Sequence, residues 1–198
     1  MLLYGAGGHA KAILSCLLVD GEQVPAIFDD APDRPEISGV TIHGKYSPSL
    51  FDTESLVIAI GDNKTRRLVS EKVSHTFGVV QHSSALIDPD VIINKGAVML
   101  HGSIIQTGSV IGHHVIINTR VSVNHDCLVA DFVHLAPGVI VCGNVNVGEN
   151  TFIGAGSVVC PNITIGINCF IAAGTVITQH IPDGSIVRGN PGRIIRTI

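Results

Sequence analysis

The chain has 198 residues, which fits one domain or two small ones. Its formal net charge of −4 at pH 7 gives no electrostatic argument for binding nucleic acid. Hydrophobic residues make up 45% of the chain, yet no apolar run approaches the ~18 positions that a membrane-spanning helix requires. Five cysteines without a CxxC pair, and an amino terminus without a signal-peptide pattern, lead us to expect a cytoplasmic protein with reduced thiols.

The first part of the chain, residues 1–80, predicts a small α/β domain. A strand over Met1–Tyr4 leads into the glycine-rich turn Gly5–Gly8, and a helix is expected over Ala12–Val19. This order of strand, turn and helix presents backbone N–H groups to a phosphate at the start of the helix. A second predicted strand, Val24–Phe28, ends in two acidic residues, about where a Rossmann-like fold holds a ribose hydroxyl.

A second glycine-containing turn follows the next long apolar strand. After a predicted hairpin through Ile37–Ile42, a strand over Leu56–Ile60 ends at Gly61–Asn63, and a helix is expected over Lys64–Val73. One such turn is equally well a tight strand–helix connection. Two of them at the ends of adjacent strands predict a ligand crevice, with room for one nucleotide half.

From Ile87 to Ile177 an aliphatic residue recurs at every sixth position. Neither the helix period of 3.6 nor the strand period of 2 explains so strict a spacing, so it indicates a repeat architecture. A second position, four residues further on, is always small or β-branched. The residue directly after each aliphatic is often Gly, Ala or Asn, which suits a turn with unusual backbone angles or a close approach of backbones.

The segments Ile153–Ser157 and Ile165–Cys169 resemble the repeats of the hexapeptide-repeat acyltransferases. That resemblance implies a left-handed parallel β-helix over residues 81–198, in which three hexads make one triangular coil and coils stack at roughly 4.8 Å. The length of the row implies a little over five coils. Because the ends of such a solenoid are exposed edges, we expect a cap at each end.

Several of the ten histidines lie in the repeat region, outside its inward positions. This holds for His125 with its neighbour Asp126, and for His134. Acyl transfer from a thioester to an amine needs a base that is active near neutral pH, and an adjacent carboxylate orients such a ring. A thioester is already activated, so no protein nucleophile is required. His113 and His114 show no partner in the pattern, and we expect both on the solvated surface.

A narrower resemblance covers nearly the whole chain. The segments Asn118–Cys127, His134–Gly138 and Gly5–His9 resemble the sialic acid O-acyltransferase-like group, which contains N-acetyltransferases of nucleotide-linked 4-amino sugars. The resemblance implies an N-acetyltransferase that uses acetyl-CoA and acts on a UDP- or GDP-linked 4-amino-4,6-dideoxy sugar. It also implies a homotrimer with the coenzyme between neighbouring prisms, and no metal.

The same resemblance assigns roles to individual residues. His125 would be the general base, Asp126 its carboxylate partner, and the N–H of Gly143 would stabilise the oxyanion. The residues expected to bind the nucleotide sugar are Gly7, Gly8, His9, Asp29, Asp30, Gly61, Asn63 and Asn118. The residues expected to bind the coenzyme are His134, Ala155, Ala173, Arg188 and Arg193. The tail around Arg193 resembles the ending that lies near the coenzyme in this family, and it is equally well a lid on the last coil.

Three alternative functions compete with this one. The first stays open, and particular residues disfavour the other two. O-acetylation of a sialic-acid-like sugar would use the same His125–Asp126 pair. A non-catalytic sugar-nucleotide-binding module is disfavoured because His125, Asp126 and His134 occur together. The γ-class carbonic anhydrases share the prism and bind zinc through three histidines, two of them five apart, but no two histidines after residue 80 have that spacing.

Overall fold

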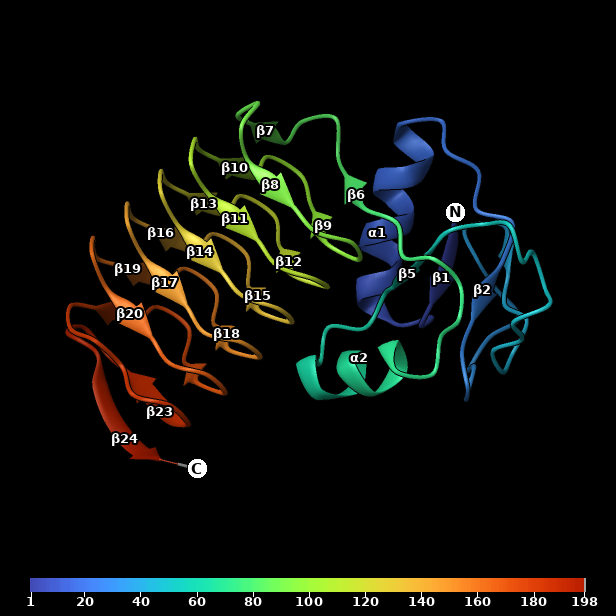
Figure 1. Cartoon of the computed structure of the whole chain (residues 1–198). Helices are drawn as coiled ribbons and strands as arrows, with labels where there is room; N and C mark the ends of the chain where they lie inside the picture. The colour runs from blue at the N-terminus through green and yellow to red at the C-terminus, as the bar shows by residue number, and fades with distance from the viewer. Residues whose placement is uncertain (198) are drawn as a thin grey trace.

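A computed structural model describes residues 1–197. The chain forms an amino-terminal α/β unit beside the first coils of a long parallel β-solenoid (Figure 1). The α/β unit contains β1 (Leu2–Tyr4), α1 (Gly8–Val19), β2 (Ile27–Phe28), β3 (Glu36–Ile37), β4 (Val40–Thr41), β5 (Leu56–Ile58) and α2 (Asn63–Ser70). Within residues 1–197 no helix is both long and apolar enough to cross a membrane.

The α/β unit is built on a three-stranded parallel sheet in the order β2-β1-β5. Successive residues of a strand point to opposite faces of the sheet. Leu3 therefore belongs to a cluster with α1 and with Val98 of the solenoid, whereas Leu2 and Tyr4 belong to a cluster with Val69 of α2. All of β1 is buried because both faces of the sheet are covered.

The predicted elements of the α/β unit are confirmed, with shifted ends. Helix α1 begins at Gly8, earlier than expected, because the extended backbone of Gly7 serves as its N-cap. Helix α2 begins at Asn63, where the carboxylate of Asp62 accepts the Thr65 N–H at 2.8 Å, and it ends earlier than expected. The predicted hairpin is the antiparallel pair of β3 and β4.

The solenoid has three faces, which we number in chain order. Face 1, next to the α/β unit, contains β6 (Val80–Gln81), β9 (Val98–Met99), β12 (Ile116–Ile117), β15 (His134–Leu135), β18 (Phe152–Ile153), β21 (Phe170–Ile171) and β23 (Ser185–Arg188). Face 2 contains β7 (Leu86–Ile87), β10 (Ile104–Ile105), β13 (Ser122–Val123), β16 (Ile140–Val141), β19 (Val158–Val159) and β22 (Val176–Ile177). Face 3 contains β8 (Ile92–Ile93), β11 (Val110–Ile111), β14 (Leu128–Val129), β17 (Asn146–Val147) and β20 (Thr164–Ile165).

Each coil pairs with the next in parallel, in the register that three hexads predict. On face 1, for example, Ile116 pairs with His134, and His134 pairs with Phe152. The left-handed β-helix is confirmed, but it has about six turns where the aliphatic row implied a little over five. The difference arises because β6 and β23 continue face 1 beyond the two ends of that row. Strand β6 also spans the point between residues 80 and 81 where we expected one domain to end.

Left-handed backbone angles recur at every sixth residue from Gly96 to Gly174. These residues lie three places after each aliphatic, so Asp126, for example, has a φ of 58°. The glycines directly after the aliphatics serve close approach of backbones instead. A methyl group on Gly148 would lie 2.5 Å from the backbone of Gly166, one coil later.

The two ends of the solenoid are covered differently. At the carboxyl end, β24 (Arg193–Thr197) pairs antiparallel with β23 and forms the expected cap. At the amino end, the α/β unit packs on face 1, where α1 contacts β6, and not over the first coil. The inward side chains of Ile87, Val91 and Ile93 in that coil are only partly buried by residues 1–197.

His114 is buried, which corrects the expectation that it lies on the surface. It is 5% exposed, its ring stacks on Phe132 with 5.0 Å between centroids, and it meets Phe77 edge-on at 4.4 Å. Phe77 belongs to the α/β unit, so a segment from another part of the chain covers this histidine and excludes solvent from it. His113 is exposed, as expected.

Arg66 of α2 ties the α/β unit to the solenoid. It is 1% exposed, and its guanidinium donates to the carbonyls of His114 at 2.9 Å and Phe132 at 2.8 Å. It also donates to the carbonyls of Ile60 at 3.1 Å and Gly61 at 3.2 Å. Burial lowers the pKa of Arg66 to about 10, so the group stays charged at neutral pH. One buried cation thus connects the end of β5 with two coils.

We expect Arg66→Met to lower the free energy of unfolding by at least about 3 kcal/mol, because several buried carbonyls lose their donor at once. Urea denaturation at pH 7 measures this. Arg34→Met is the matched control, since the Arg34 side chain is 38% exposed and, within residues 1–197, forms an ion pair with its neighbour Asp33 alone. Its unfolding midpoint should stay at the wild-type value. Equal midpoints for wild type and Arg66→Met would contradict the role given to Arg66.

Candidate active site

The turn between β1 and α1 is open to an anion. Gly7 is the N-cap of α1, no side chain of residues 1–197 caps this end of the helix, and the first turn has no acidic residue. A methyl group on Gly7 or Gly8 would meet no atom of the described residues within 4 Å, and both glycines are exposed. The first N–H groups of a helix lack partners inside the helix, so this end can bind a phosphate.

The two acidic residues after β2 are already hydrogen-bonded to the backbone and side chains around this turn. Asp29 accepts the N–H of Ala6 at 2.7 Å and the N–H of Ala31 at 2.9 Å. The Tyr4 hydroxyl donates to Asp30 at 3.0 Å, and burial together with this carboxylate raises the pKa of Tyr4 to about 12. Asp29 therefore fixes the shape of the glycine-rich turn in the described structure.

The second turn, after β5, lies beside the first and is bonded to the solenoid. A methyl group on Gly5 would lie 2.8 Å from the Ile60 side chain, so the two turns pack tightly. The Asn63 amide donates to the carbonyls of Asn150 and Thr151, each at 3.2 Å. These bonds hold the start of α2 against the edge between faces 3 and 1.

His134 on face 1 is neutral, and both of its ring nitrogens are engaged. Nδ1 lies 3.1 Å from the carbonyl oxygen of Gly61, so Nδ1 carries the proton and donates. Nε2, 3.2 Å from the Asn118 amide nitrogen, is then the acceptor. Burial lowers the pKa of His134 to about 4, although the bond to Gly61 opposes that shift. His134 thus joins the second turn to the solenoid.

His9 follows the glycine-rich turn and lies near His134, with 6.1 Å between ring centroids. Burial, followed by the proximity of His134 and Arg66, lowers the pKa of His9 to about 4. Its Nε2 atom is buried and has no hydrogen-bond partner among residues 1–197. A neutral imidazole with one unpaired nitrogen therefore stands where the first turn meets the solenoid.

A cleft of about 930 Å³ lies between the start of α2 and the carboxyl-terminal part of face 1. Its wall on the solenoid includes Phe152 and Phe170, whose rings stack with 5.2 Å between centroids. Its lining residues are Gly61, Asp62, Asn63, Lys64, His134, Asn150, Phe152, Ile167, Asn168, Cys169, Phe170, Asp183 and Gly184. The glycine-rich turn of β1 does not line it, so the predicted crevice is displaced towards the second turn.

The sequence analysis missed the aromatic wall of this cleft. The signal was present, because Phe152 and Phe170 directly precede inward aliphatics and so point outward. Outward phenylalanines stand out in a chain with only 4% aromatic residues. Two of them 18 residues apart stack in adjacent coils.

His125, Asp126 and Gly143 meet at the edge between faces 2 and 3. His125 Nδ1 lies 2.9 Å from the Asp126 carboxylate, and these side chains are 57% and 67% exposed. A methyl group on Gly143 would lie 2.6 Å from His125 Nε2, so only glycine leaves room for this ring one coil below. The expected catalytic trio is therefore assembled by two adjacent coils.

The trio and the cleft lie on opposite sides of the prism. The edge between faces 2 and 3 is the edge opposite face 1 in a triangular coil, and His134 lies on face 1. The solenoid core separates the two sites. No single chain therefore brings His125 into contact with the cleft.

The residues expected to bind the coenzyme lie on the carboxyl-terminal coils. Ala155 and Ala173 are exposed and stacked at the edge between faces 1 and 2, where Gly174 N–H donates to the Ala155 carbonyl at 2.8 Å. Arg188 and Arg193 are exposed and face each other across β23 and β24. The structure thus brings the four together as two neighbouring pairs, away from His134.

Comparisons with known proteins cover both parts of the chain. Residues 1–73 match the family described as the PglD N-terminal domain, and residues 144–179 match the family described as bacterial transferase hexapeptide (six repeats). A crystal structure of a perosamine N-acetyltransferase from Caulobacter crescentus, in complex with CoA and GDP-perosamine, is 35% identical. The alignment covers 98% of this chain and 96% of that one, with a TM-score of 0.95. The chain belongs to the PglD-type family of hexapeptide-repeat acetyltransferases.

Another member of the family is the acetyltransferase domain of PglB from Neisseria gonorrhoeae, solved in complex with acetyl coenzyme A. It is 32% identical, with 98% of each chain covered and a TM-score of 0.91. An uncharacterised protein of Acanthamoeba polyphaga mimivirus is 35% identical over 97 residues. That match covers 46% of this chain and only 19% of the viral protein.

We expect the stability of the protein to fall as pH drops from about 6.5, the ordinary histidine pKa, to about 4, the pKa of folded His134. In this window the unfolded chain binds more protons than the folded chain. The free energy of unfolding therefore falls by up to about 1.4 kcal/mol per pH unit for one such residue. His134→Gln should reduce this slope in urea denaturation series across the window. His113→Gln, at an exposed histidine, should keep it. Identical slopes for the two variants would refute the assignment of a neutral His134.

Proposed function

We propose that this protein transfers the acetyl group of acetyl-CoA to the amine of a nucleotide-linked 4-amino sugar. The observation that carries the proposal is the exposed His125–Asp126 pair beside the backbone of Gly143, in a chain alignable over 98% of its length with an N-acetyltransferase bound to CoA and GDP-perosamine. Two acetyltransferases of the family provide independent support for acetyl-CoA as the donor.

The chemistry follows from the tautomer of His125. An ionised carboxylate only accepts hydrogen bonds, so Nδ1 carries the proton and donates a hydrogen bond to Asp126. Nε2 then keeps its lone pair. In our proposal the amine nitrogen attacks the thioester carbonyl carbon while Nε2 takes the amine proton. The N–H of Gly143 donates to the oxyanion that forms. The tetrahedral intermediate then releases the CoA thiolate, which receives the proton from the imidazolium.

The buried thiol next to Asp126 does not suit a covalent mechanism. Cys127 is buried, its Sγ donates to the carbonyl of Cys142 at 3.1 Å, and burial raises its pKa. A raised pKa leaves less of the thiolate that a nucleophile requires. Direct attack of the amine on the thioester therefore remains the simplest route.

The α/β unit is the proposed binding site of the nucleotide. The open helix end at Gly7 and Gly8 suits a diphosphate, and the aromatic wall of the neighbouring cleft suits a base or a sugar ring. For the coenzyme, exposed Arg188 and Arg193 offer charges for phosphate groups, and the stacked alanines leave room for an extended chain. The free cysteines are consistent with the cytoplasmic location that we propose.

A homotrimer completes the site in this proposal. His125 lies across the prism from the cleft and the nucleotide turn, so an acceptor held there reaches a base only on another copy of the chain. Outward apolar side chains such as Leu128 (46% exposed) and Ile140 (41% exposed) flank the edge that carries His125. They provide surface for contact with a neighbouring copy.

The direct test is consumption of acetyl-CoA with a panel of UDP-, GDP- and dTDP-linked 4-amino sugars. His125→Ala should lower kcat by about 10²–10⁴-fold, the usual contribution of a general base. Asp126→Asn should lower it less, because the base remains and asparagine tolerates the left-handed backbone at this position. His113→Gln, at an exposed histidine outside the trio, should keep the wild-type kcat. A full kcat for His125→Ala would contradict the mechanism, and no turnover with any acceptor would contradict the function.

A complementation test addresses the shared site. Gly8→Asp places a negative charge in the open nucleotide turn without a steric clash, so it should abolish acceptor binding while the fold persists. Assembled alone, Gly8→Asp and His125→Ala should both be nearly inactive. Co-expressed in equal amounts, they should recover about a quarter of wild-type turnover, since random assembly joins the two intact halves in about one site in four. No recovery in mixed oligomers would mean that each chain forms its own site.

A further inference from the structure

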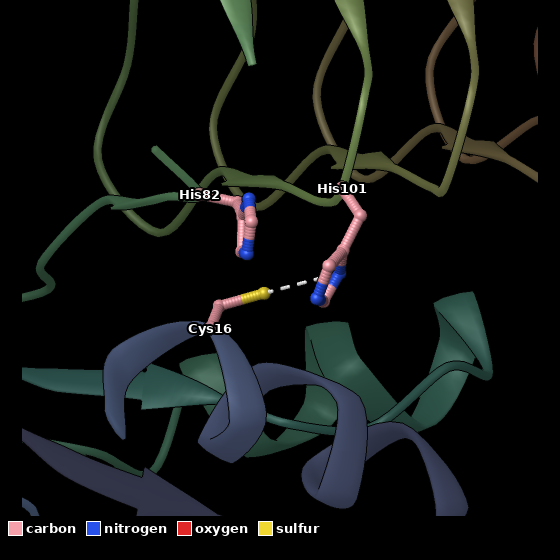
Figure 2. Close-up of side chains that lie close together, drawn as sticks. All are labelled: Cys16, His82 and His101. Atoms are coloured by element: carbon pink, nitrogen blue, oxygen red, sulfur yellow. Dashed lines mark hydrogen bonds between the residues drawn. The ribbon is translucent and has the colours of Figure 1, made fainter. Parts of the chain in front are cut away.

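Three side chains that the proposed mechanism does not use converge between α1 and the first two coils. Cys16 lies on the buried side of α1, His82 follows β6, and His101 follows β9 (Figure 2). One donor atom from each lies within 4.8 Å of the other two. Cys16 and His82 are buried and His101 is partly exposed. Three segments far apart in the sequence therefore bring one sulfur and two imidazoles together.

The spacing of these atoms is close to that in a metal site. Cys16 Sγ lies 3.7 Å from His101 Nδ1, and Figure 2 shows the thiol pointing at that ring. In a tetrahedral zinc site, bonds of about 2.3 Å to sulfur and about 2.0–2.1 Å to nitrogen put such a pair roughly 3.6 Å apart. The rings of His82 and His101 stack with 3.8 Å between centroids and 30° between planes. Turning these two rings apart would let one nitrogen of each ring face the same ion.

Ser84 holds the ring of His82 in place. Its Nδ1 lies 2.7 Å from the Ser84 hydroxyl, which also accepts the N–H of Gly102 at 2.9 Å. The backbone N–H of Ser84 donates to the same His82 nitrogen at 3.0 Å, so Nδ1 accepts and the neutral ring carries its proton on Nε2. Histidine ligands of metals ordinarily donate their second nitrogen to an oxygen. Binding an ion through Nε2 would therefore move the ring proton to Nδ1, where the Ser84 hydroxyl can accept it.

We propose that Cys16, His82 and His101 form a binding site for a zinc-class divalent metal ion. Thiolate and imidazole ligands select Zn²⁺ and similar ions over Mg²⁺ and Ca²⁺, which prefer oxygen. When the ion binds, a metal–sulfur bond replaces the S–H bond of Cys16, and the proton leaves to solvent. A water molecule entering past the partly exposed His101 supplies the fourth ligand.

The site has a consequence for the arrangement of the two parts of the molecule. The ion would join α1 to the first two coils, on the side of the α/β unit away from Arg66 and α2. The amino end of the same helix carries the Gly7–Gly8 turn. Metal binding would therefore fix the helix that presents the nucleotide turn, without touching the His125 trio.

The test uses tag-free full-length protein that has been stripped with EDTA and dialysed. Titration with Zn²⁺ against a competing chelator should give one tight site per chain. Titration with Co²⁺ should give a thiolate-to-cobalt charge-transfer band and the visible bands of a tetrahedral ion. Added Zn²⁺ should raise Tm, because a ligand that binds only the folded state stabilises it.

The variants separate this site from other thiols and histidines. Cys16→Ser and His101→Gln should each weaken Zn²⁺ binding by more than about 100-fold, beyond the loss that an orienting partner causes. Ser84→Ala, which removes the hydroxyl that would accept the Nδ1 proton of metal-bound His82, should weaken it by about 10–100-fold. Cys160→Ser and His113→Gln, outside the cluster, should bind as wild type does. Circular dichroism establishes that each variant is folded.

Two results would overturn the proposal. One is wild-type protein that binds no Zn²⁺ and gives a Co²⁺ spectrum without the thiolate band, which would leave only a thiol–imidazole hydrogen bond. The other is folded Cys16→Ser with wild-type affinity, which would move the ion elsewhere. Both measurements are independent of acetyl transfer, so they stand whether or not the proposed activity is found.

Discussion

The guanidinium of Arg66 is the interaction on which the geometry of this molecule depends. It is buried with its charge and satisfied by carbonyl oxygens of Ile60 and Gly61 on one side and of His114 and Phe132 on the other. An unpaired buried cation is costly, so these acceptors must stay in place together. The α/β unit therefore cannot pivot on the solenoid without breaking several charge-assisted hydrogen bonds at once. Gly61, which lines the cleft, is held in place by the same contacts.

The hexad repeat decides where chemistry can occur. Side chains on one edge of the prism are separated from the opposite face by a core of stacked aliphatics. The His125–Asp126 pair on the edge between faces 2 and 3 and the Gly7–Gly8 turn beside face 1 are therefore held apart in one chain. A rigid solenoid cannot bend to join them, whereas in the trimer that we propose the edge of one copy would lie near the face of another.

Burial gives the histidines of this chain different chemistry. His9, His114 and His134 lie between the α/β unit and the solenoid, and burial lowers the pKa of each to about 4. They act as neutral donors, acceptors and packing groups. His125 is exposed, and among residues 1–197 its ring is hydrogen-bonded to Asp126 alone, which leaves its second nitrogen open to solvent. The same residue type is thus buried at the junction in one place and exposed on the prism edge in another.

The sequence by itself determined the solenoid, because the period of six is set by the chain's own hydrophobic pattern and needs no distant partner. It also determined that His125 and Asp126 point outward together, and that glycine-rich turns follow β1 and β5. The tertiary structure decided everything that depends on the docking of the α/β unit onto face 1. It buried His114, engaged both nitrogens of His134, and displaced the crevice towards the aromatic wall at Phe152. It also gathered Cys16, His82 and His101, which no spacing connects. These contacts join residues far apart in the chain, across a surface that has no sequence repeat. Local sequence patterns therefore do not predict them.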